Sequence, residues 1–120
     1  MSESRGGVLI KIDGAPHFID AADAVAIEHA PRIEKVPGAP TEIAGITAYR
    51  GEIIAVIALS NSPATAMLVV RQGSELVGLV GAEIVGTGIF TDESAPLLDI
   101  AAIHTRVHGG AWAGRWGKLS

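Results

Sequence analysis

Short apolar runs separated by turn-forming residues dominate the pattern along this chain. The run Val8-Leu9-Ile10-Lys11-Ile12 is followed by Asp13-Gly14 and by a return at His17-Phe18-Ile19, which predicts a β-hairpin. Residues 25–36 alternate loosely and are interrupted at Ala30-Pro31. A broken strand is favoured there over a helix, because proline lacks a backbone donor and clashes with the preceding helical turn.

The most apolar segment lies in the middle of the chain. Residues 46–49 and 52–59 are expected to pair around an Arg50-Gly51 turn. The second of these strands has apolar residues on both faces, which is typical of a strand buried on both sides. The run Asn61-Ser62-Pro63-Ala64 is rich in turn formers and is the best internal boundary.

The second half of the chain repeats the first in outline. Residues 67–70 and 76–80 echo the first hairpin, and residues 96–103 echo the strand at 53–59. The pattern therefore predicts two related β units divided near residues 60–65, with the second unit shorter than the first.

Composition places these strands in a single domain. The chain has 120 residues, of which 48% are hydrophobic and only 4% aromatic, and its 15 glycines and 6 prolines are spread among the apolar runs. This favours one all-β domain with many turns. We expect the domain to span residues 8–108, between a flexible tail at 1–7 and a Trp/Gly-rich tail at 109–120.

Charge and residue usage exclude several function classes. A net charge of −4 argues against nucleic-acid binding, and the absence of cysteine excludes disulfides, thiolate catalysis and cysteine-ligated metals. The N-terminus has no basic region followed by an apolar core, and no apolar run approaches the roughly 20 residues that span a bilayer. We therefore expect a cytoplasmic protein without membrane insertion.

No catalytic or metal-binding set stands out. His104 and His108 have the spacing that would place them on one helix face, but Gly109-Gly110 follows and no cysteine or well-spaced carboxylate completes a metal site. The carboxylates and serines lack a base–nucleophile arrangement. The sequence predicts no enzyme activity, no catalytic residue, no metal and no cofactor.

One motif carries more information than the strands around it. Val36-Pro37-Gly38-Ala39-Pro40 is followed at a fixed distance by Gly45 and by Tyr49-Arg50-Gly51. This layout resembles the Val-Pro-x-x-Pro and Gly-x-x-x-[Leu/Tyr]-Arg-Gly elements of CheW-type coupling proteins. The resemblance covers roughly residues 8–103.

The resemblance implies both a fold and a function. The fold would be two intertwined five-stranded SH3-like barrels with a hydrophobic groove between them, the second barrel being trimmed in this chain. The function would be that of a non-catalytic adaptor or scaffold, which joins the cytoplasmic tip of a chemoreceptor to the regulatory domain of a chemotaxis histidine kinase. Carried over by position, the partner-binding residues are Val36, Pro37, Pro40, Gly45, Tyr49, Arg50 and Gly51.

Departures from the family pattern keep a second function open. Ala48 stands where the family usually has asparagine, and Ala55 and Ala58 replace its usual proline and aspartate. The alternative is a small regulatory or ligand-binding β-barrel outside the chemotaxis array. An adaptor needs exposed apolar patches, whereas a ligand-binding protein needs an enclosed pocket with converging polar groups. From the residues alone, Arg50 is equally a structural turn residue or a partner contact.

The segment from Trp112 to Lys118 is the most aromatic and basic part of the chain. We expect it to dock on the chain's own barrel and to cover an open sheet edge, the alternative being a short motif offered to another protein. A trimmed barrel with an uncovered edge would also allow self-association.

Overall fold

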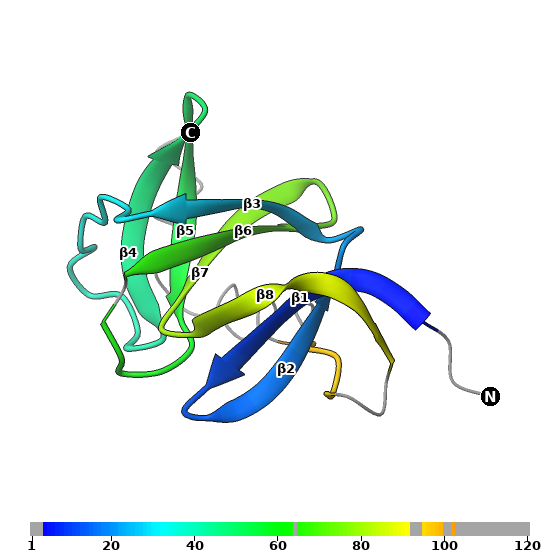
Figure 1. Cartoon of the computed structure of the whole chain (residues 1–120). Coiled ribbons are helices and arrows are strands. Elements are labelled where there is room, and N and C mark those ends of the chain that lie inside the picture. Colours follow the sequence, from blue (N-terminus) through cyan, green and yellow to red (C-terminus); the bar gives the residue numbers. More distant parts are fainter. Residues whose placement is uncertain (1–3, 64, 92–94, 100–101, 103–120) are drawn as a thin grey trace.

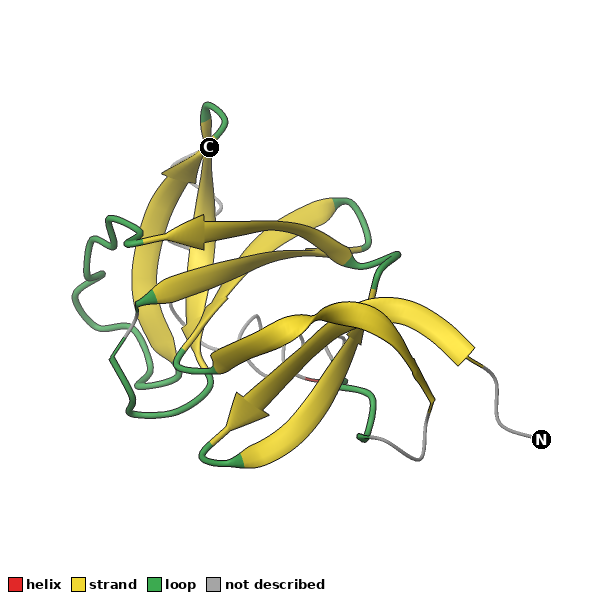
Figure 2. Ribbon diagram, in the orientation of Figure 1, coloured by secondary structure: helices red, strands yellow, loops and turns green. Residues whose placement is uncertain are grey.

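The protein is described by a computed structural model covering residues 4–63, 65–91, 95–99 and 102 (Figure 1). Strands and connecting loops make up almost all of this part (Figure 2). The strands are β1 (Ser4–Ile12), β2 (Ala15–Asp20), β3 (Ala24–His29), β4 (Ile43–Tyr49), β5 (Glu52–Ala58), β6 (Ala66–Gln72), β7 (Glu75–Val80) and β8 (Glu83–Thr91). The expected all-β class is confirmed.

The strands form two sheets. One has five strands in the order β3-β6-β7-β5-β4, and the other has three in the order β2-β1-β8. The smaller sheet combines strands from the two ends of the described chain, because β8 returns to pair antiparallel with β1. The two subdomains are therefore intertwined, as the family resemblance implied.

The loop at residues 60–65 does not separate the two sheets. It connects β5 to β6, and both strands belong to the five-stranded sheet. The sheets are thus not the consecutive halves expected from the weak repeat. The trimmed unit is the three-stranded sheet, which contains the first two strands and the last.

Two of the predicted turns have the geometry that their residues favour. Asp13 and Gly14 have φ values of 50° and 83°, and Arg50 and Gly51 have φ values of 49° and 81°. Positive φ at both central residues is the pattern of a type I′ turn, whose twist matches that of the flanking strands. The hairpins β1–β2 and β4–β5 are confirmed at the positions expected from the sequence.

Two apolar clusters hold the fold together. The first joins the sheets to each other and contains Val8, Ile10, Ile19, Ile43, Ala55, Ile57, Leu68, Val70, Val77 and Leu79. The second lies within the five-stranded unit and contains Tyr49, Ile54, Val56, Met67, Val69 and Val80. Alternate residues of β5 enter different clusters, so the expected burial of both its faces is confirmed for residues 54–57. Ile53 differs, because it lies at the start of the strand and is exposed.

The chain returns to the smaller sheet after β8. The amide of Phe18 donates to the carbonyl of Pro96 over 2.9 Å, and the amide of Leu98 donates to the carbonyl of Phe18 over 2.8 Å. These bonds form an isolated parallel bridge between Leu97 and Phe18, which lies on β2. We expected a strand over residues 96–103. Among the described residues of this range only Leu97 forms a β-bridge, and residues 100, 101 and 103 lie outside the described part.

Candidate functional site

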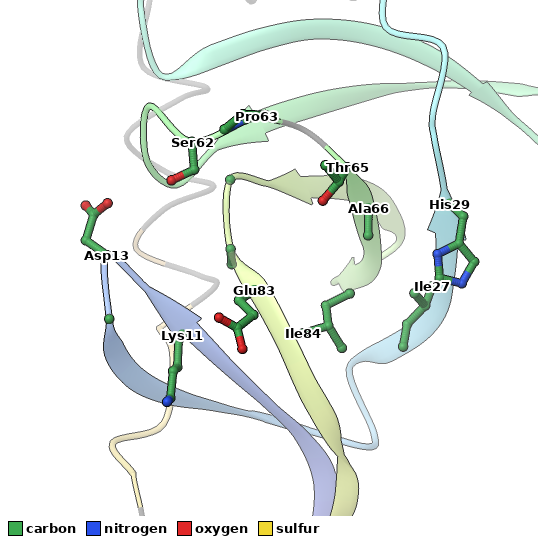
Figure 3. A pocket seen from close by; sticks show the side chains of 13 residues that line it. Lys11, Asp13, Ile27, His29, Ser62, Pro63, Thr65, Ala66, Glu83 and Ile84 are labelled. Atoms are coloured by element: carbon green, nitrogen blue, oxygen red, sulfur yellow. The ribbon is translucent and has the colours of Figure 1, made fainter.

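A groove with a volume of about 670 Å³ lies at the junction of the two sheets (Figure 3). We call it the inter-sheet groove. Its walls come from the β1–β2 hairpin, β3, the β5–β6 loop and the connection from β7 into β8. The side chains labelled in Figure 3 are Lys11, Asp13, Ile27, His29, Ser62, Pro63, Thr65, Ala66, Glu83 and Ile84.

Ile27 of strand β3 lines this groove and is 36% exposed, and its neighbour Val25 is 37% exposed. Together they line a smaller adjoining hollow. Ala24 and Ala26 pack against different clusters, and the register of β3 against β6 shifts between them, so the side chains of this edge strand do not alternate regularly. Val25 and Ile27 form a small apolar strip that is available to a partner.

Charged side chains surround the apolar part of the groove. Lys11 and Glu83 are partners in the β1–β8 register, and Asp13 lies at the tip of the β1–β2 hairpin. An apolar strip inside a polar rim is the usual anatomy of a protein–protein interface. The groove is open to solvent and therefore differs from an enclosed ligand pocket, in which a few polar groups converge on a small molecule.

A second hollow, of about 560 Å³, contains Tyr49 and Arg50. We call it the Arg50 hollow. It is bounded by the end of β3, the segment at residues 30–34, β4 and the start of β5. His29 lines both this hollow and the inter-sheet groove, so the two surfaces adjoin.

The wall of the Arg50 hollow is held by bonds between β4 and the segment before it. The amide of Glu34 donates to the carbonyl of Ile46, and the amide of Ile46 donates to the carbonyl of Glu34, both over 2.8 Å. The hydroxyl of Thr47, which is buried, donates to the carbonyl of Arg32. Residues 32–34 are therefore held along the edge of β4, where Arg32 and Glu34 form part of the wall of the hollow.

Arg50 occupies a backbone conformation that costs energy for an arginine. Its φ of 49° lies in the left-handed region, which disfavours non-glycine residues by roughly 1–2 kcal/mol. The guanidinium carbon Cζ lies 5.5 Å from the centre of the Tyr49 ring, within the range of a cation–π contact. Arg50 is exposed, so its guanidinium stacks on the protein and still faces solvent.

We predict that Arg50→Gly is at least as stable as the wild type. Glycine adopts the left-handed conformation without strain, which offsets the loss of an exposed cation–π contact of roughly 0.5–1 kcal/mol. Urea unfolding of both proteins measures the difference. A loss of more than about 1 kcal/mol would instead make Arg50 a residue of the fold.

The residues predicted from the motif fall into three groups. Tyr49 and Arg50 line the Arg50 hollow, with Gly51 beside them in the turn. Val36, Pro37 and Pro40 belong to the loop that leads into β4 and line neither surface. Gly45 serves the fold, because a side chain at its position would collide with the backbone carbonyl of Glu34.

The family resemblance implied a hydrophobic groove between the two barrels, but the residues that line the inter-sheet groove were not identified from the sequence. None of the seven motif residues lines it among the described residues. Its apolar lining residues Ile27 and Ile84 belong to ordinary apolar strand segments, which carry no signal of exposure.

A metal site and a membrane-spanning helix, neither of which is expected from the sequence, can be sought only in the described part of the chain. Residues 4–63, 65–91, 95–99 and 102 contain no group of three histidine, cysteine or acidic side chains that could hold a metal ion. His104 and His108 lie outside those residues. The same part of the chain contains no helix long and apolar enough to cross a membrane.

Comparisons with known proteins give the chain its family. A search of curated proteins finds no match. The crystal structure of the scaffolding protein TtCheW from Thermoanaerobacter tengcongensis is similar, with a TM-score of 0.67 and 21% identity over 77% of this chain and 69% of that one. This likeness supports the fold. The model of the CheW-like domain matches residues 6–95. The chain therefore belongs to the CheW-like domain family.

Proposed function

We propose that this protein is a cytoplasmic, non-catalytic adaptor that couples a chemoreceptor to a chemotaxis histidine kinase through protein–protein contacts. Its family is one of chemotaxis adaptors and scaffolds. The observation that carries the proposal is the exposed apolar strip of Ile27, in an open groove with a polar rim, and Val25, in the adjoining hollow. Such a strip is energetically unfavourable in water and is therefore best explained by a partner that covers it.

We assign the inter-sheet groove to the cytoplasmic tip of the receptor. An amphipathic helix binds a groove through an apolar ridge formed by residues three and four positions apart. In this chain Val25, Ile27 and Ile84 would contact that ridge, while Lys11 and Asp13 at the rim would pair with charges beside it. The regulatory domain of the kinase would then bind a surface outside the groove.

The Arg50 hollow would extend the receptor contact past His29. Arginine is a frequent anchor at interfaces, and the strained turn of Arg50 supports a role beyond the fold. Exposed Ile53 lies in the same hollow and adds apolar surface. The loop residues Val36, Pro37 and Pro40 would act indirectly, by positioning β4 and its turn.

We predict that Ile27→Lys weakens binding of a receptor cytoplasmic fragment by about 30-fold. A lysine on the apolar strip must be desolvated against the partner, and loss of a central contact costs about 2 kcal/mol. Titration of labelled receptor fragment with each purified protein measures the change. The fold should be retained, since Ile27 is already partly exposed.

Ser74→Lys is the matched control for this experiment. It adds the same charge at an exposed position in the β6–β7 turn, outside both candidate surfaces. We expect this variant to bind as the wild type does. Equal weakening by both substitutions would point to a general charge effect, and no weakening by Ile27→Lys would remove the groove from the contact.

A further inference from the structure

Among the described residues, one edge of the three-stranded sheet has no neighbouring strand. Strand β8 pairs with β1 on one side and with no described strand on the other. Its sequence, Glu-Ile-Val-Gly-Thr-Gly-Ile-Phe-Thr, contains no lysine, arginine or proline and only one charged residue, at its start. Natural proteins protect free edges with such residues or cover them, so this edge calls for a covering segment.

Two apolar side chains stand beside this edge. Val85 is 45% exposed, and Ile89, at 75%, is the most exposed large apolar residue of the described chain. Val85 lies where the register of β8 against β1 shifts, and Ile89 lies in the regular part of the strand. A segment that covers the edge would therefore gain by presenting apolar side chains beside them.

The opposite edge of the sheet, on β2, is already paired with the returning chain. The bridge from Phe18 to Leu97 places the returning chain against β2, so the spatial order is Leu97, β2, β1, β8. Residues 103–120 follow this point and lie outside the described part. Residues 103–109, which would connect this point to the bound segment, reach roughly 23 Å when fully extended, whereas the path across four adjacent strands is about 15–20 Å. The chain is long enough to reach β8.

The C-terminal segment has the complementary chemistry. Residues 103–120 contain Arg106, Arg115 and Lys118 and no acidic residue, so they carry a net charge of +3 while the remaining chain carries −7. Glu83 begins β8, and Asp92-Glu93 directly follows it in the sequence. Residues 110–120 carry Arg115 and Lys118 of these three, and their charge of +2 is attracted to Glu83 at the start of this strand.

The two tryptophans suit a segment that covers this edge. Trp112 and Trp116 are four positions apart, so an extended segment would carry both on one face. The register of β8 against β1 shifts at Val85, so the regular part of β8 is the part that contains Ile89. An antiparallel alignment would place Trp112 beside Ile89, an aromatic–aliphatic pair of the kind that stabilises adjacent strands.

We propose that residues 110–120 of the same chain bind along the free edge of β8 and complete the smaller subdomain. The occupant is the chain's own C-terminus because a tethered segment has an effective concentration in the millimolar range, far above that of a second molecule. This proposal does not depend on the identity of the receptor or the kinase.

Intrinsic fluorescence tests the proposal in the full-length protein. The chain contains two tryptophans, both in this segment, so its indole emission reports on the segment alone. We expect emission at clearly shorter wavelength than N-acetyl-tryptophanamide, and reduced quenching by acrylamide. Ile89→Lys should abolish both differences, whereas Ile53→Lys on the other sheet should leave them intact. Circular dichroism on each variant confirms that the fold is retained.

Three outcomes would overturn the proposal. Wild-type emission equal to that of N-acetyl-tryptophanamide would mean that the indoles are not docked. Emission that is unaffected by Ile89→Lys would place them elsewhere. A difference that disappears on dilution would assign the edge to a second copy of the chain.

Discussion

Gly45→Ala is expected to lower the free energy of unfolding by at least about 3 kcal/mol. Gly45 has a φ of 149°, which lies in a region that only glycine adopts readily. A Cβ atom there would also collide with the backbone carbonyl of Glu34 and lie 2.8 Å from Cγ2 of Ile33. The backbone of Glu34 cannot move aside without breaking its adjacent bridge with Ile46. The backbone strain and the lost hydrogen bonds therefore both lower the stability of the variant.

Gly86→Ala is the control for this prediction. Its Cβ would meet no atom within 4 Å, and its backbone is not in the left-handed region. We expect the stability of this variant to lie within about 0.5 kcal/mol of the wild type. Similar urea midpoints for Gly45→Ala and Gly86→Ala would contradict the role of Gly45 as the point of close approach between β4 and the preceding segment.

Phe18→Ala is expected to destabilise the protein by about 3–5 kcal/mol. Phe18 is only 1% exposed and is among the largest fully buried side chains. Its ring lies over Gly7, where an added Cβ would come within 2.6 Å of the ring atoms Cε2 and Cζ. Because its backbone also pairs with Pro96 and Leu98, truncation leaves a cavity beneath the returning chain.

Phe18→Leu separates the packing effect from the backbone pairing. Leucine keeps the hydrogen bonds of residue 18 and fills much of the volume, so we expect this variant to be clearly more stable than Phe18→Ala. Thermal unfolding followed by circular dichroism measures both. Equal stability of the wild type and Phe18→Ala would mean that the smaller sheet contributes little to the stability that thermal unfolding measures.

Local turn chemistry explains why the hairpins were predictable. Asp13-Gly14 and Arg50-Gly51 specify their turns within two residues, and the apolar runs beside them specify the strands. The pairing of β8 with β1 has no such local signal, because its partners lie at opposite ends of the described chain. The apparent repeat reflected the similarity of any two apolar hairpins, and it therefore did not identify the sheets.

The candidate site was predictable only in part. The motif identified Tyr49 and Arg50, which do lie together on a surface hollow. It could not identify Val25 and Ile27, since an apolar residue in a strand is normally expected to face the core. Their exposure depends on the position of β3 at the edge of the five-stranded sheet and on the register shift between Ala24 and Ala26, neither of which can be inferred from the sequence.

The most direct test of the adaptor function is an NMR titration of the isotopically labelled protein with the cytoplasmic fragment of a chemoreceptor from the same organism. We predict that the largest changes in amide chemical shift fall on residues 25–29 and 82–84 and on the β1–β2 hairpin, with smaller changes at Tyr49 and Arg50. Changes confined to other surfaces, or no changes at a large excess of the receptor fragment, would contradict the adaptor function.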